Sequence, residues 1–162
     1  MKPVVQDLAD RWEAAWSGRD QHAFRHVCSS DVFYEDPLSQ APLDGPEAIG
    51  IHARKLWTAL PDARVERTGE RLSDGQFLVA PFVLRGTHRG DLENLPASNR
   101  SLSLHGVCYC QLDPPRERLW RVRVFLDRYD AAVQIGVLPA SGTVSERAFL
   151  MARGFGLRLG RR

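Results

Sequence analysis

The sequence predicts an α+β fold in which helices come first in the chain and a run of antiparallel strands follows. Up to Leu60 the apolar residues recur at helical spacing, and after Pro61 they alternate along extended runs. The chain has 162 residues, of which 43% are hydrophobic, so it is long enough for one domain with its own core.

Local signals place the first elements. We expect helices over residues 4–17, 20–27 and from Pro46 onward. Asp20 suits a helix N-cap, and Pro46 suits the first turn of a helix. Between these helices, residues 31–35 are predicted to be extended, because Pro37 keeps the residue before it out of the helical region. A further helix is expected over residues 128–136.

The second half of the chain is predicted to form two hairpins. The expected strands cover residues 63–72, 77–87, 101–112 and 119–126. The first pair is joined at residues 73–75 (SDG) and the second pair at residues 113–116 (DPPR). Residues 88–99 are rich in Gly, Pro, Asn and charge, so they are predicted to be a loop. A curved sheet of such strands against the helices leaves room for a pocket between them.

Composition excludes several classes of function. The net charge of +2 does not favour nucleic acid as a partner. No apolar run follows Lys2, and every apolar stretch is too short to cross a bilayer, so we expect no signal peptide and a cytoplasmic protein. Cys28, Cys108 and Cys110 fit a reducing compartment. We expect them to be buried thiols and expect no metal site.

Two carboxylates stand out as candidates for acid and base chemistry. Asp127 lies at the junction of a predicted strand and helix in FLDRYDAAVQIGVLP, and Asp36 lies in VFYEDPLSQAPLDGPEAI. A carboxylate in an apolar pocket suits proton transfer. The structural alternatives are that Asp127 caps the following helix and that Asp36 forms a turn before proline.

Four runs in order along the chain carry a family resemblance: RWEAAWSGRDQHAFRHVCSSDVFYEDP, LDGPEAI, RGTHRG and DRYDAAVQIGVLP. Over roughly residues 4 to 139 the chain resembles the SnoaL-like polyketide cyclase branch of the nuclear transport factor two-like superfamily. The resemblance implies a cone-shaped α+β barrel with a deep apolar pocket, usually in a homodimer. It also implies a cofactor-independent enzyme that acts on a small apolar carbonyl or ester compound.

By this resemblance Asp127 matches the acid/base aspartate of the cyclases, which moves a proton during intramolecular aldol ring closure. That reaction requires no metal or cofactor. Asp36 matches the segment that carries the general base of ketosteroid isomerases, and a hydrogen bond to Tyr34 or His52 is expected. Trp12 and Cys108 stand where the isomerase has its oxyanion donors, so steroid isomerisation is disfavoured.

Two further residues resemble positions in relatives of this family. Arg85 matches the arginine of an Asp–Arg–Asp arrangement in limonene epoxide hydrolases, but Thr87 replaces one of the carboxylates. His88, in a GTHRG run at a strand end, is a candidate for orienting a substrate or donating a proton. The alternative is a histidine that hydrogen-bonds the backbone in a turn.

The catalytic candidates are therefore Asp127, Asp36 and His88. The candidate substrate-binding residues are Trp12, Trp16, Tyr34, Trp57, Arg85, Cys108 and Phe125, although for most of the aromatic residues a place in the core is the alternative. A non-catalytic protein that binds a small hydrophobic ligand is the alternative function, as is an epoxide hydrolase or isomerase.

The chain is predicted to divide into a SnoaL-like domain, residues 1–139, and a basic amphipathic extension, residues 140–162. Thr143 or Ser145 is expected to cap a helix that continues through Met151. Such a segment packs on a dimer mate or lies on an anionic membrane, and we favour the dimer mate.

Overall fold

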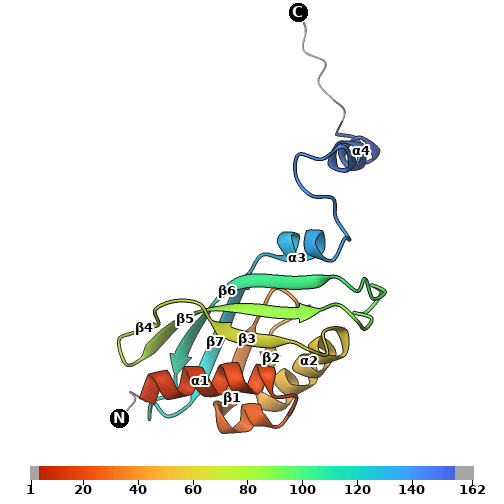
Figure 1. The fold of residues 1–162 in the computed structure, drawn as a ribbon. Helices are drawn as coiled ribbons and strands as arrows, with labels where there is room; N and C mark the ends of the chain where they lie inside the picture. Colours follow the sequence, from red (N-terminus) through yellow and green to blue (C-terminus); the bar gives the residue numbers. More distant parts are fainter. Residues whose placement is uncertain (1–3, 156–162) are drawn as a thin grey trace, which may run out of the picture.

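The structure is a computed structural model that describes residues 4–155, and it has the predicted α+β class (Figure 1). The helices are α1 (Val4–Ser17), the short 3₁₀ helix η1 (Ala23–His26), α2 (Pro46–Ala59), α3 (Arg128–Gln134) and α4 (Val144–Ala152). The strands are β1 (Cys28–Glu35), β2 (Leu43–Asp44), β3 (Arg64–Arg67), β4 (Leu72–Ser73), β5 (Phe77–Thr87), β6 (Ser101–Leu112) and β7 (Leu119–Leu126).

All seven strands belong to one curved sheet, which α1 and α2 cover on its concave side (Figure 1). Its order is β2-β1-β7-β6-β5-β3, and β4 pairs with β5. The expectation of a purely antiparallel sheet is wrong at one place, because β1 pairs with β7 in parallel. This pairing brings the front of the chain beside its last strand, so the sheet is mixed.

The strands β5, β6 and β7 begin and end at the residues that the alternation predicts. The single strand predicted over 63–72 is instead divided into β3 and β4. The reason lies in β5, where Pro81 has no N–H to continue the ladder beyond the Arg67–Phe82 pair. The prediction of one strand over residues 63–72 was therefore wrong. The pairing is interrupted by the partner strand β5 and not by the sequence of residues 63–72.

The second predicted helix is reduced to η1. Asp20 does accept a hydrogen bond from the backbone N–H of His22, at 2.8 Å, but this closes a turn and not an α-helix. The chain then enters β1 at Cys28, earlier than the predicted start of the extended segment. The short strand β2 was not predicted, since two residues carry no periodic signal.

The core lies between the helices and the sheet, and an aromatic cluster stands at its centre. Trp12, Trp16, Phe24 and Tyr34 are all buried, and the Trp16–Phe24 ring centroids are 5.2 Å apart. The three cysteines are buried and unpaired, as predicted. Within residues 4–155 no helix is both long enough and apolar enough to span a membrane.

Arg71 joins α1 to the sheet through a buried ion pair. Its side chain is only 1% exposed, and it donates to Asp10 at 2.6 Å and to Glu13 at 2.8 Å. Two carboxylates on successive turns of α1 therefore hold one guanidinium, which fixes the helix against the β3–β4 connection.

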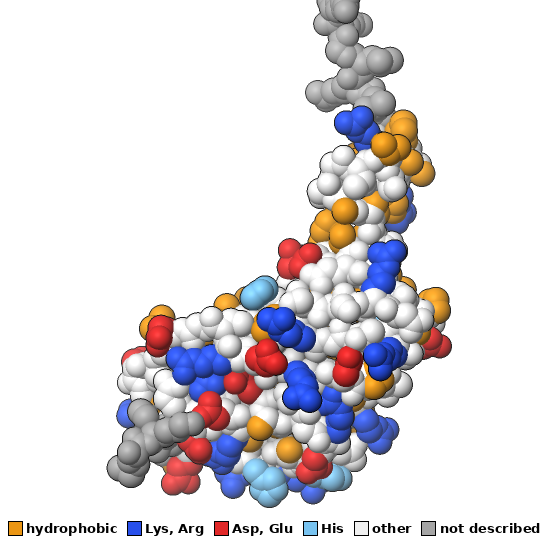
Figure 2. Space-filling model, viewed as in Figure 1, with side chains coloured by type: hydrophobic (Ala, Val, Ile, Leu, Met, Phe, Trp, Pro, Cys, Tyr) orange, Lys and Arg blue, Asp and Glu red, His pale blue; other side chains and the backbone are white. Residues whose placement is uncertain are grey.

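The C-terminal extension stands away from the rest of the chain. Thr143 caps α4 by accepting a hydrogen bond from the N–H of Glu146. Of the two predicted caps, Thr143 and not Ser145 is therefore the one that the structure has. No described residue of α4 is buried, and hydrophobic side chains are visible along the projecting segment (Figure 2). Residues 156–162, the basic end of the predicted extension, lie outside the described residues.

Replacing Arg71 by methionine is expected to lower the free energy of unfolding by about 2 to 4 kcal/mol, because Glu13 would keep a largely buried charge without its partner. Urea unfolding would measure the loss. Arg67→Met is the matched control: its ion pair with Glu70 is exposed, so a change within about 0.5 kcal/mol is expected. Equal losses in both variants would contradict the role given to Arg71.

Removal of residues 140–162 is expected to change the melting temperature by less than about 2 °C, because no described residue of α4 is buried. Differential scanning calorimetry at several protein concentrations would check this. A larger fall that depends on concentration would show that the extension packs on a second copy of the chain.

Candidate functional site

A cavity of about 610 Å³ lies between the helices and the concave face of the sheet. Its walls are mainly apolar and aromatic, from α1, β1, α2, β5 and β7. The residues that line it include Trp12, Trp16, Tyr34, Leu43, Ile51, Leu56, Phe82, Leu84, Val124, Leu126 and Ile135. A volume of this size suits a small organic ligand.

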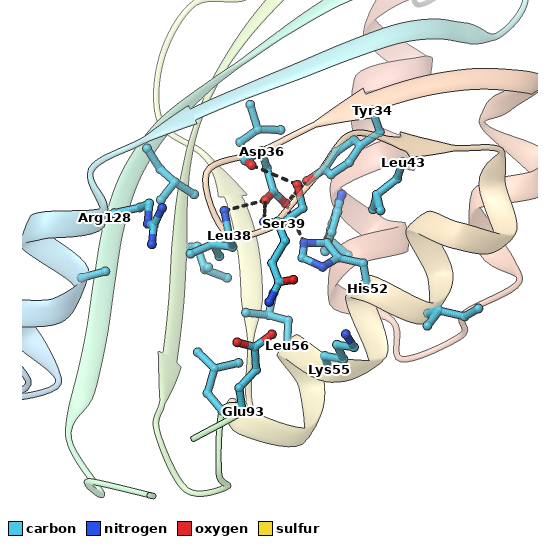
Figure 3. A pocket seen from close by; sticks show the side chains of 18 of the residues that line it. Tyr34, Asp36, Leu38, Ser39, Leu43, His52, Lys55, Leu56, Glu93 and Arg128 are labelled. Atoms are coloured by element: carbon cyan, nitrogen blue, oxygen red, sulfur yellow. Dashed lines mark hydrogen bonds and ion pairs between the residues drawn. The ribbon is translucent and has the colours of Figure 1, made fainter. Parts of the chain in front are cut away.

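Asp36 is the buried carboxylate of this cavity, and its side chain is only 4% exposed (Figure 3). One oxygen, Oδ1, accepts hydrogen bonds from the backbone N–H groups of Leu38 and Ser39, at 2.7 and 2.6 Å. The other, Oδ2, accepts from the Tyr34 hydroxyl at 2.6 Å and from Nε2 of His52 at 2.7 Å. The expected bond to Tyr34 or His52 is confirmed, and both partners are present.

The local sequence explains this arrangement. β1 ends at Glu35, and after Asp36 and Pro37 the chain turns so that the N–H groups of Leu38 and Ser39 point back at the carboxylate. His52 comes from α2, which Pro46 begins. The site is therefore held by a strand end, a turn and a helix.

The four hydrogen bonds determine the charge of Asp36. Burial raises the pKa of its carboxyl, but the bonds and charge of His52, together with the bonds from Tyr34 and Ser39, outweigh burial, so that the pKa lies below its usual value. Burial and the neighbouring Asp36 raise the pKa of Tyr34 well above its usual value. Tyr34 therefore stays a protonated donor beside an ionised carboxylate.

His52 is the side chain of the site that can exchange a proton. An ionised carboxylate only accepts hydrogen bonds, so Nε2 of His52 carries a hydrogen. Nδ1 makes no hydrogen bond with any group in residues 4–155, and the ring lines the cavity. In the neutral ring, Nδ1 then has a lone pair available to a ligand.

Asp127 occupies a different place. It caps α3 by accepting hydrogen bonds from the N–H groups of Tyr129 and Asp130, as the structural alternative predicted. It is exposed and borders a second hollow, together with Phe125. The proposed catalytic role of Asp127 stays a prediction, and this position favours the cap.

His88 and Arg85 also lie apart from the cavity lining. His88 is 2% exposed, and its Nδ1 accepts a hydrogen bond from the N–H of Ser98 at 3.2 Å, which agrees with the structural alternative. Arg85 is exposed and forms an ion pair with Glu66 at 3.4 Å. Neither residue meets Asp36 in this structure.

The predicted substrate-binding residues divide into two groups. Trp12, Trp16 and Tyr34 line the cavity. Trp57 is buried in the core and donates to the backbone oxygen of Trp16 at 2.7 Å. Cys108 is buried with its sulfur 3.2 Å from that of Cys110, and Phe125 is 53% exposed on the other side of the sheet.

The sequence predicted His52 only as a partner of Asp36. It did not predict that Lys55 and Arg128 line the cavity, as both do. The sequence does indicate that Lys55 lies beside His52, because residues three apart on a helix share a face. Residues 4–155 contain no cluster of side chains suited to a metal ion.

Comparison with known proteins gives a family match. A model of the SnoaL-like polyketide cyclase family matches residues 6–135. No curated protein sequence matches the chain.

Several solved structures have the same fold. TsrD from Streptomyces laurentii has a TM-score of 0.74 and 20% identity, over 85% of this chain and 98% of its own. A protein with a ketosteroid isomerase-like fold from Catenulispora acidiphila has a TM-score of 0.69 and 19% identity, over 85% and 97%. IdmH from Streptomyces antibioticus, described as a candidate polyketide cyclase, has a TM-score of 0.69 and 16% identity, over 81% and 97%. The TM-scores show that this chain shares its fold with these three proteins.

Asp36→Asn is expected to cost about 2 to 3 kcal/mol of stability at neutral pH, because an amide cannot accept all four hydrogen bonds. The pKa of Asp36 is lowered by folding, so its contribution is present above the usual value of 3.8 and is lost as pH falls through the folded value. Urea unfolding from pH 7 to pH 2 should show wild type and variant converging below pH 3.8.

Asp127→Asn provides the control for this measurement. Asparagine caps a helix about as well as aspartate, so a change within about 0.5 kcal/mol is expected. A constant difference between wild type and Asp36→Asn at every pH would contradict the ionised, hydrogen-bonded Asp36.

Proposed function

The chain belongs to the SnoaL-like polyketide cyclase family, and from that premise we propose that it is a cofactor-independent enzyme acting on a small apolar carbonyl or ester compound. The observation that carries the proposal is the Asp36–His52 pair in an apolar cavity. His52 lines the cavity and its Nδ1 makes no hydrogen bond within the described residues, while Asp36 holds its Nε2–H.

In this proposal His52 is the general base. Nδ1 removes a proton from the carbon next to the substrate carbonyl, and the electron pair of that C–H bond moves to the carbonyl oxygen to form an enolate. The imidazolium that forms is stabilised by the carboxylate of Asp36, 2.7 Å from Nε2. The enolate carbon then attacks a second carbonyl of the same molecule, and the proton on His52 passes to the new alkoxide.

The surroundings support this assignment. Tyr34 and two backbone N–H groups bind Asp36, so the carboxylate is fixed, and its pKa lies below its usual value, which makes it a weaker base than an ordinary carboxylate. The aromatic rings of Trp12 and Trp16 offer apolar walls to a flat substrate.

Two other functions share the cavity. A protein that only binds a small hydrophobic ligand would need the same apolar walls and would use Asp36 to fix the turn. An epoxide hydrolase-like reaction is less well supported, because Arg85 pairs with Glu66 outside the cavity lining.

We further propose that the protein is a cytoplasmic homodimer. The support is an exposed apolar surface on the outer side of β6 and β7, where Val107, Tyr109 and Phe125 are 37%, 43% and 53% exposed.

Deuterium exchange would test the proposed base directly. With 2-acetylnaphthalene in D₂O, the wild-type protein is expected to accelerate exchange of the methyl protons, followed by proton NMR. His52→Gln is expected to lower the catalysed rate by about a hundredfold, because the general base is lost. Asp36→Asn is expected to lower it as well, because the ring is no longer held.

Asp127→Asn is the matched control and is expected to keep the wild-type rate, since Asp127 lies outside the cavity lining. Calorimetric titration with the same ketone separates binding from chemistry. Binding without accelerated exchange would support the ligand-binding alternative. Exchange that needs Asp127 and not His52 would move the catalytic role to the strand-end aspartate.

A further inference from the structure

The cavity contains three charged side chains that the proposed reaction does not use. Lys55 comes from α2, Arg128 from the first turn of α3, and Glu93 from the loop between β5 and β6. None of the three makes a hydrogen bond or ion pair with any group in residues 4–155. The other carboxylate of the lining, Asp36, is fully hydrogen-bonded.

The two cations reach the cavity from different sides. In Figure 3, Arg128 lies on one side of the Asp36–Leu38 turn, and Lys55 lies on the other, below His52. Glu93 lies near Lys55 in the same view. With two positive groups against one negative group, the lining outside the Asp36–His52 pair has a surplus of one positive charge.

The rest of the lining gives an anionic ligand somewhere to place its body. Apolar and aromatic residues make up most of the walls, from Trp12 and Trp16 to Val124 and Ile135. Lys55, Arg128 and Glu93 are exposed, so an anion beside the two cations gains about as much as in a surface ion pair, while the apolar walls hold the rest of the ligand.

From this arrangement we propose that the cavity selects an amphipathic carboxylic acid. Its apolar, flat body lies among the aromatic residues, and its carboxylate lies beside one of the two cations, Lys55 or Arg128. Arginine can bind a carboxylate through two parallel N–H groups, while lysine contributes a single ammonium. Glu93 opposes binding of the anion and so limits its affinity.

The inference rests on the proposed function for the reaction that such a ligand undergoes. The new claim concerns only the charge of the ligand, which is separate from proton abstraction by His52. Lys55 lies three residues after His52 on α2, so a carboxylate bound there would place the neighbouring part of the ligand close to the imidazole.

A matched pair of ligands tests the selection. Isothermal titration calorimetry would compare 2-naphthylacetic acid with its methyl ester, which has the same apolar body without the charge. At low ionic strength the acid is expected to bind about fivefold more tightly than the ester. The preference should shrink at about 0.5 M salt, because the added ions screen the attraction between the carboxylate and the two cations.

Variants at the three charged positions should change the acid-to-ester preference in opposite directions. The double variant Lys55→Met with Arg128→Met is expected to reduce it to about one, and Glu93→Gln to raise it about twofold. Arg54→Met is the control, because Arg54 is an exposed cation of the same helix that hydrogen-bonds Gln21 and does not line the cavity. It should leave the preference unchanged.

Several outcomes would overturn the inference. These are an ester that binds as tightly as the acid, a preference that survives the double variant, or no binding of either probe at millimolar concentration. His52→Gln separates this test from that of the proposed function. It should lower the rate of deuterium exchange about a hundredfold yet keep the preference for the acid, so that failure of one proposal is visible without failure of the other.

Discussion

The hydrogen bonding of Asp36 is the constraint on which the rest of the site depends. A single carboxylate joins the end of β1, the turn after Pro37 and, through His52, the helix α2. A buried anion with fewer partners would take up a proton or move into water. With four donors it remains ionised, and it therefore both fixes the local chain and orients the imidazole. Structure and proposed chemistry thus rely on the same bonds.

Curvature of the sheet supplies the other half of the site. The strands β5, β6 and β7 turn alternate side chains toward α1 and α2, and the helices approach them only in part. Aromatic packing among Trp12, Trp16 and Phe24 fills one end of the space. The other end stays open as the cavity. The core and the cavity are two parts of one interface, which is why Trp12 and Trp16 belong to both.

Much of the fold could be predicted, because long alternating runs specify strands and their ends without knowledge of their partners. The division of β3 from β4 could not, since it depends on Pro81 in a neighbouring strand. The position of Asp127 was open to prediction by alternation: Val124 and Leu126 line the cavity, so Asp127 belongs with Phe125 on the opposite side. The proposed role of His52 was harder to predict, because it depends on how closely the fold brings His52 to Asp36, and the sequence does not give that distance.

The parallel pairing of β1 with β7 has a consequence for how the chain acquires its structure. It joins residues near the beginning of the domain to those near its end, so the sheet is rich in contacts of long sequence separation. Such contacts have high loop-closure entropy and slow the folding of the chain. During synthesis the wall of the cavity cannot close until β7 has left the ribosome. The aromatic surface beneath it stays open for most of translation, and the nascent chain is then most exposed to misassociation.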